Sequence, residues 1–173
     1  CPTGRTFVHT SGLRGHHGDM GMESSHLGRY VLLKLDEMIG VVAGMDDREA
    51  NAVPDLEGAN SAYQILEHCL GMIAEWTRAN ILGEPVDRDR DAEFEAEGSV
   101  AELVERAGRA RQQLVADLER MEPGAEAPGR PGKEAFWAHS VDGILLHVLE
   151  ELCQHLGHLE ITRDVVHAGR RPA

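Results

Sequence analysis

The chain has 173 residues, which suits one folded domain, and its 30 acidic and 17 basic residues give it a net charge of −13. Its 42% hydrophobic and 27% charged residues are too apolar for a disordered chain, and no window is apolar enough to span a membrane. Negative surface charge repels phosphate groups, so we expect neither nucleic acid nor membrane surfaces as partners. Three scattered cysteines and the lack of an apolar signal sequence predict a reducing, cytoplasmic location.

The first 22 residues are the least regular part of the chain. They contain five glycines and three histidines and show no apolar periodicity, which predicts a flexible tail or an extension. His16 and His17 could offer a second metal site, although adjacent histidines in a glycine-rich tail are usually solvated. We expect the folded domain to cover residues 23–168, followed by a short tail over 169–173, and we expect residues 1–20 to be dispensable for the fold.

Four segments carry the period of an amphipathic helix, and four helices with one apolar stripe each pack most simply as an all-α four-helix bundle. The charge run from Asp87 to Glu97 is expected to be a solvated loop. Phe136 and Trp137 are expected to pack the loop before the last helix onto the domain. The predicted helices span residues 24–45, 61–83, 99–121 and 141–167, with loops over 46–59, 83–98 and 122–139.

Serines mark the start of three of these helices. Ser61 followed by Gln64, and Ser99 followed by Glu102, have the spacing of a capping box, in which each side chain bonds the backbone of the other residue. Ser140 stands where a cap of the last helix is expected.

The last predicted helix departs from a simple amphipathic pattern. Beside its apolar face runs a stripe of four titratable residues, which are His147, Glu151, His155 and His158. Glu150 points outward in this pattern, whereas Glu151 points toward the core. A carboxylate that faces a bundle core is costly unless it is paired or binds a metal.

The stripe predicts a metal site. Glu151 and His155 lie one helical turn apart, a spacing that lets both reach one ion at about 2.0–2.2 Å. His68, at the border of the apolar face of the second helix, supplies a third donor. These three ligands leave a fourth position open, as in catalytic zinc sites, and nickel or iron could replace zinc. Cys153 points away from this set, and Cys69 has the position of a small core residue.

The same residues also allow a bundle without a metal. In that arrangement Glu151 would pair with an arginine from another helix, and the histidines would form hydrogen bonds within the core. Four titratable groups in one stripe, with His68 on another helix, favour the metal.

Two segments of the sequence resemble the DinB/YfiT-like metal-binding bundles. They are Ile65–Leu70 (ILEHCL), with Glu75 and Trp76, and Leu146–Arg163 (LHVLEELCQHLGHLEITR). The resemblance covers roughly residues 24–167 and is closest to the branch that contains the N-terminal domain of mycothiol-dependent maleylpyruvate isomerase. It implies a DinB/YfiT-like architecture and a metal triad in which a glutamate replaces one histidine. That triad falls on His68, Glu151 and His155.

The resemblance also implies a chemistry, namely metal-dependent transfer or isomerisation that uses a low-molecular-weight thiol such as mycothiol and a small electrophilic molecule. His158 or His147 would relay a proton or orient a ligand, and a hydrogen bond to Glu151 or to the backbone is the alternative role. The isomerase has a further C-terminal domain that contributes to its active site, and this sequence ends at Ala173. We therefore do not expect maleylpyruvate isomerisation itself.

Two other functions would use the same site. One is a non-catalytic metal-binding protein of the stress response, and the other is a metal-dependent hydrolase, because an open zinc site can also activate water. Bundles of this kind commonly form homodimers, which is the expected assembly.

Overall fold

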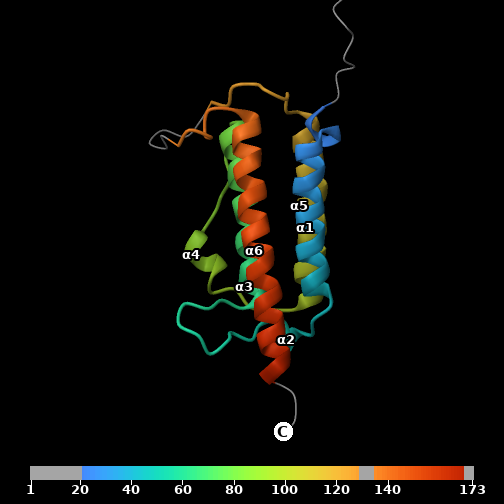
Figure 1. Ribbon diagram of the computed structural model, residues 1–173, viewed down its shortest axis with the longest axis vertical. Coiled ribbons are helices and arrows are strands. Elements are labelled where there is room, and N and C mark those ends of the chain that lie inside the picture. Colours follow the sequence, from blue (N-terminus) through green and yellow to red (C-terminus); the bar gives the residue numbers. More distant parts are fainter. Residues whose placement is uncertain (1–20, 129–134, 170–173) are drawn as a thin grey trace, which may run out of the picture.

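Four long helices dominate the computed structural model, which describes residues 21–128 and 135–169 (Figure 1). No strand occurs within these ranges, apart from one isolated bridge between Glu126 and Ser140, so the all-α prediction is confirmed. None of the described helices is long and apolar enough to cross a membrane. The long helices are α1 (His26–Ala43), α3 (Ala62–Ala74), α5 (Val100–Glu119) and α6 (Val141–Gly169), and α3 continues into the π-helical segment η2 (Glu75–Ile81).

Three short helical turns complete the described part of the chain. They are η1 (Met22–Ser24), α2 (Asp47–Ala50) and α4 (Arg90–Glu93). The segments predicted as loops over 46–59 and 83–98 therefore each contain one helical turn. The predicted tails fall largely on residues 1–20 and 170–173, which lie outside the described residues.

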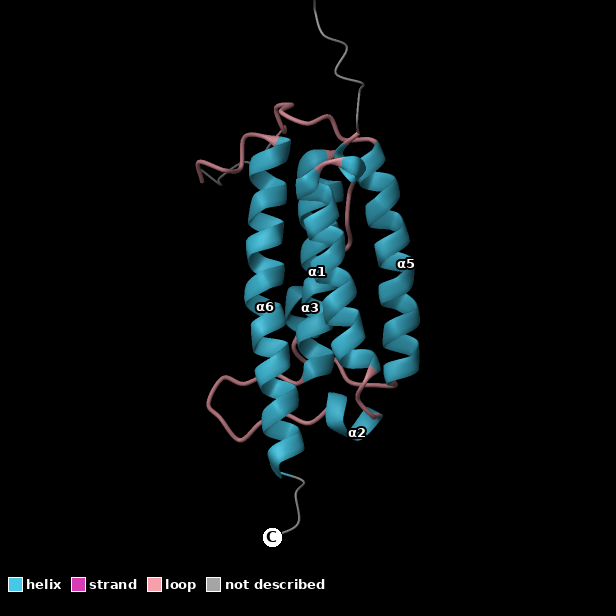
Figure 2. Cartoon of the chain, turned by 45° about the vertical axis from the view of Figure 1, so that its right-hand side comes forward, coloured by secondary structure: helices cyan, strands magenta, loops and turns pink. Residues whose placement is uncertain are grey.

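The direction of the helices determines how the site is built. α1 and α6 run in one direction, and α3 and α5 run in the other (Figures 1 and 2). Because α3 and α5 are consecutive long helices with the same direction, the chain between them must return along the length of the bundle. This return segment, residues 82–99, is called the crossover below. It contains α4, which packs against α3.

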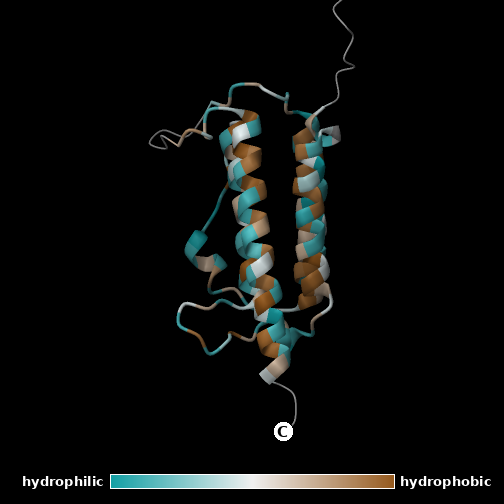
Figure 3. Cartoon of the chain, viewed as in Figure 1, coloured by the Kyte–Doolittle hydropathy of each residue, from teal (hydrophilic) through white to brown (hydrophobic). Residues whose placement is uncertain are grey.

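The core lies along the axis of the bundle. α6 packs between α1 and α3, and α5 also contacts both of these helices. Each long helix places a leucine at the centre that is at most 1% exposed, namely Leu35, Leu66, Leu114 and Leu152. Hydrophobic and hydrophilic residues alternate around the helices (Figure 3), which is the pattern of helices that bury one face.

Side-chain caps fix the start of three helices. Ser25 Oγ accepts a hydrogen bond from the Gly28 amide, and Ser61 and Gln64 form the predicted reciprocal capping box. Ser140 Oγ accepts from the Gly143 amide at 3.1 Å, which confirms the predicted cap of α6.

The predicted capping box at Ser99 is wrong. The Ser99 side chain caps no backbone amide. Instead, the amide of Val100 donates to Asp47 Oδ1 at 2.8 Å. A carboxylate from α2 thus satisfies the first amide of α5, so the cap comes from a residue that is distant in the sequence.

The loop before α6 packs through one of its two aromatic residues. Trp137 lies edge-on to Trp76, with 5.0 Å between ring centroids, as predicted. Phe136 is 93% exposed, so the expectation that it also packs is wrong.

Candidate metal centre

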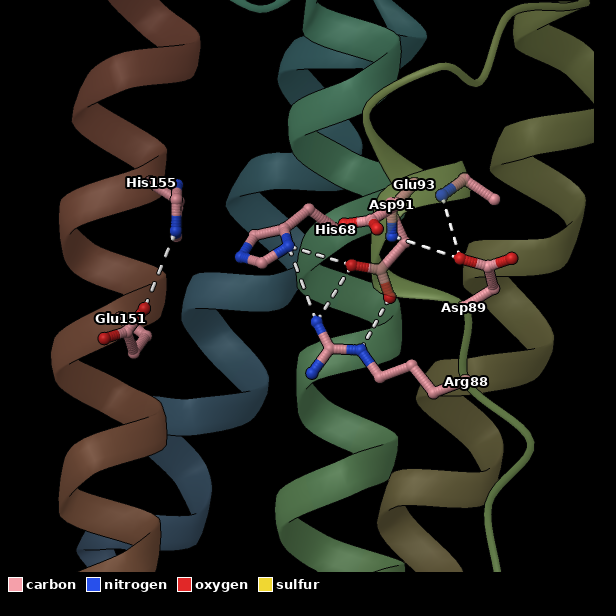
Figure 4. A network of polar contacts seen from close by, with 8 residues as sticks. His68, Arg88, Asp89, Asp91, Glu93, Glu151 and His155 are labelled. Atoms are coloured by element: carbon pink, nitrogen blue, oxygen red, sulfur yellow. Dashed lines mark hydrogen bonds and ion pairs between the residues drawn. The ribbon is translucent and has the colours of Figure 1, made fainter.

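His68 is the part of the site that α3 contributes, and its position is tightly determined. The side chain is 8% exposed, and Nδ1 lies 2.9 Å from Glu93 Oε2 in α4. An ionised carboxylate only accepts hydrogen bonds, so the imidazole donates through Nδ1–H. The other ring nitrogen, Nε2, is therefore free to accept, and the ring points from α3 toward α6 (Figure 4).

Arg88 holds Glu93 in place. Its Nε lies 2.6 Å from Glu93 Oε1, and its Nη2 lies 2.9 Å from Oε2. Planar two-point pairing of this kind is the strongest form of arginine–carboxylate contact, and both side chains are largely buried, at 14% and 10% exposed. Arg88 Nη2 also comes within 3.5 Å of His68 Nδ1, which is too long for a good hydrogen bond.

The crossover residues Arg88 and Glu93 were not predicted as part of the site. They belong to the charge run that the sequence indicated to be a solvated loop, so that interpretation is wrong for these two residues. The nearest signal in the sequence is Phe94, an aromatic residue within the charge run. Phe94 stacks on the His68 ring, with 4.8 Å between centroids.

α6 places Glu151 and His155 on the side of the helix that faces His68. His155 Nε2 lies 3.6 Å from Glu151 Oε2, and the His68 and His155 rings are 5.0 Å apart, edge to face. Burial disfavours the charged ring, and the neighbouring His68 adds to this, so the pKa of His155 is lowered. His155 is therefore held in the neutral form that can bind a metal.

The donor chemistry of these residues suits a divalent metal. Two imidazoles and a carboxylate are ligands that zinc commonly uses. His155 Nδ1 is buried without a hydrogen-bond partner among the described residues, and the hydrogen bond at His68 Nδ1 leaves Nε2 free. Within residues 21–128 and 135–169, however, no three histidine, cysteine or acidic side chains are close enough to share an ion as they stand. Metal binding would therefore require these side chains to change their positions.

The two histidines predicted to assist catalysis lie in different surroundings. His147 stacks on Trp137, with 3.8 Å between centroids, and lies edge-on to Trp76. Its Nε2 is 3.8 Å from Glu151 Oε1. His158 is exposed, and its ring lies 5.6 Å from that of His155. His147 is thus fixed beside the carboxylate, whereas His158 stands at the solvent-facing edge of the site.

The described cysteines lie outside the donor set. Cys69 is fully buried, and burial raises the pKa of its thiol, so it stays protonated as a core residue. Cys153 is exposed on α6. Both positions agree with the sequence-based interpretation.

An opening connects the centre with solvent on the side of Glu151. This cavity has a volume of about 270 Å³ and is polar in character, with Glu75, Arg88, Arg90, His147 and Glu151 among its lining residues. A molecule that enters here reaches the carboxylate and the His68 ring directly.

Comparison with known protein families gives a match. The family model described as the DinB superfamily matches residues 33–159, which is more than two thirds of the chain. The matched range includes His68, Glu151 and His155. No curated protein and no solved structure gives a significant match to this sequence.

Proposed function

This chain belongs to the DinB superfamily, whose members often bind a metal, and we propose that it is a metal-dependent enzyme. In this proposal the enzyme uses a low-molecular-weight thiol, such as mycothiol. It either transfers the thiol to a small electrophilic molecule or isomerises that molecule. The proposed ligands of the metal, with zinc as the first candidate, are His68, Glu151 and His155.

One observation carries this proposal. Two imidazoles from different helices face each other at 5.0 Å, with a carboxylate one helical turn away and a solvent-connected cavity beside them. Glu151 is half-buried, and the buried Nδ1 of His155 has no hydrogen-bond partner among the described residues. Polar groups removed from water in this way are costly unless a ligand or a hydrogen bond compensates them. A three-residue donor set beside an opening suits a catalytic metal better than a structural one, because a catalytic metal needs one position for substrate.

A bound divalent metal would lower the pKa of a coordinated thiol, so that the nucleophilic thiolate is present near neutral pH. The residues of the chain have separate tasks around it. Glu93 accepts the hydrogen bond from His68 Nδ1–H, so the proton stays on Nδ1 and Nε2 faces α6. The two tryptophans fix His147 beside Glu151, and exposed His158 is placed to exchange protons with solvent.

Metal binding can be tested directly. The purified, metal-free protein is titrated with zinc, and the variants His68→Ala, Glu151→Ala and His155→Ala are compared with His167→Ala. This control removes an exposed histidine of α6. We expect about one equivalent of zinc in the unaltered protein and the control, as for a three-ligand site, and a large loss of affinity in the other three variants. Full binding by His155→Ala would contradict the proposed ligand set.

The thiol reaction is tested with the zinc-loaded protein. A panel of cellular thiols that includes mycothiol is incubated with a chromogenic electrophile, and we expect a rate enhancement that disappears in Glu151→Ala. Hydrolysis of esters or amides without thiol would instead support the hydrolase. Tight zinc binding without either reaction would support the metal-binding protein.

A further inference from the structure

A second cavity lies on the other side of the His68–His155 pair and has a different character. It has a volume of about 280 Å³, and both histidines are part of its lining. It extends toward the C-terminal end of α6, whereas the polar cavity lies toward the N-terminal end, beside His147 and Glu151. The candidate metal centre therefore has two separate approaches.

Apolar surface makes up most of the walls of this second cavity, although Glu57, Asn60 and Thr162 also line it. Ile65 comes from α3, Phe94 follows α4, Ile161 comes from α6, and Leu56 comes from the loop before α3. Leu56 and Ile161 are 64% and 62% exposed. Large aliphatic side chains that remain in water around a concave site are typical of a surface that binds an apolar ligand.

The polar cavity could not serve an apolar group equally well. It contains Glu75, Glu151 and two arginines. Arg88 is paired with Glu93, while the guanidinium of exposed Arg90 lies over the Phe94 ring, at 5.3 Å from the centroid. Placing hydrocarbon among these charges would remove water from them without compensation. The difference between the two cavities thus determines which side receives the apolar part of a substrate.

We propose that the cavity between Leu56, Ile65, Phe94 and Ile161 binds the apolar group of the substrate, while the polar end of the same molecule reaches His68 and His155. An engineered protein cavity of about 150 Å³ holds one benzene molecule. The cavity described here accommodates a phenyl ring with a short linker, or a branched alkyl chain of similar size. The inference that this cavity binds an apolar group does not depend on the proposed function. Only the statement that this group belongs to the substrate rests on it.

The cavity itself is tested without metal. Benzyl alcohol is titrated into the metal-free protein, and methyl resonances of Ile65, Ile161 and Leu56 are followed by NMR. We expect saturable shifts of these methyls. Ile161→Asp should abolish the shifts at Ile65 and Leu56, whereas Val165→Asp, which alters another exposed residue of α6 outside the cavity lining, should preserve them. Absence of saturable shifts, or their persistence in Ile161→Asp, would overturn the inference.

The link to the metal centre is tested with two hydroxamates, which bind zinc through their oxygens. We expect phenylacetohydroxamate to bind the zinc-loaded protein at least tenfold more tightly than acetohydroxamate, because burial of the extra apolar surface favours binding. Ile161→Asp should remove this difference without weakening acetohydroxamate. Equal affinities would overturn the inference. If benzyl alcohol shifts the methyls but neither hydroxamate binds, the cavity stands and the proposed function fails.

Discussion

A carboxylate can accept a hydrogen bond but cannot donate one. Glu93 therefore determines which ring nitrogen of His68 carries the proton. The contact at Nδ1 assigns the ring proton to that nitrogen and leaves Nε2 as the free acceptor. Arg88 neutralises the buried carboxylate and keeps it oriented. The ability of His68 to act as a ligand therefore depends on two residues of the crossover.

Replacing Glu93 by alanine should change the protonation pattern of His68. In the metal-free protein at pH 8.5, long-range proton–nitrogen NMR should show the His68 proton on Nδ1. In Glu93→Ala it should shift toward Nε2, and zinc affinity should fall by about 10- to 100-fold, the usual effect of losing such a partner. Glu95→Ala, which removes a nearby exposed glutamate, is the control. An unchanged tautomer in Glu93→Ala would show that the contact has no such role.

His155 should make the stability of the metal-free protein depend on pH. Its pKa is lowered in the folded state by burial and by His68, whereas an unfolded histidine titrates near about 6.5. Below that pH the unfolded chain binds a proton that folded His155 resists, so stability falls on acidification. Urea unfolding between pH 7.5 and 5.5 should therefore show a smaller loss for His155→Gln than for the unaltered protein. Equal losses would mean that His155 is not the group responsible.

At the level of elements, the helix starts show which contacts are local. Ser61 and Gln64 satisfy each other within one turn of α3. At the start of α5, the first amide, that of Val100, donates to Asp47, which belongs to a different element. Two serines in similar sequence contexts therefore have different energetic roles.

The two serines should respond differently to substitution by alanine. Ser61→Ala removes an N-cap hydrogen bond and should lower the free energy of unfolding by about 1 kcal/mol. Ser99→Ala removes no such bond and should change stability by less than about 0.5 kcal/mol, as for substitutions away from such features. Urea denaturation of both variants makes the comparison. A loss at Ser99 as large as that at Ser61 would contradict the assignment of the cap to Asp47.

The same contrast explains how much the sequence could predict. Apolar periodicity and local caps were sufficient to predict the four long helices and the caps at Ser61 and Ser140. The periodicity of α6 also placed Glu151 and His155 on one face, and the structure brings His155 close to His68. Whether these residues bind a metal remains a prediction.

The features that the sequence did not predict all depend on contacts between segments that are distant in the chain. Arg88 and Glu93 lie in a stretch whose composition is typical of solvated loops, and only the path of the crossover brings them to His68. In the same way, Asp47 reaches Val100 from another helix. Local patterns contain no information about such pairings.

At the scale of the whole molecule, the site joins two parts of different construction. α3 and α6 are long helices with buried faces, whereas the crossover is mostly irregular and contains one helical turn. Backbone amides in segments with few buried contacts open more readily than those in core helices. We therefore expect the crossover to exchange its amide hydrogens faster than α6.

Hydrogen exchange followed by mass spectrometry tests this expectation. Peptides from residues 84–98 should exchange faster than peptides from the centre of α6 in the metal-free protein. Because Glu93 holds a proposed ligand, zinc binding should slow exchange in the crossover more than in α5, which has no part in the site. Identical rates in the crossover and α6 would show that the two parts open together.

The shared direction of α3 and α5 also affects how such a protein can diversify. The crossover contributes Arg88, Glu93 and Phe94 to the site, and its helical turn α4 packs against α3 at the edge of the bundle. Changes in its length or composition can therefore alter what surrounds His68 while leaving the core leucines untouched. A bundle connected in this way can acquire new substrate preferences through a single segment that lies beside the four long helices.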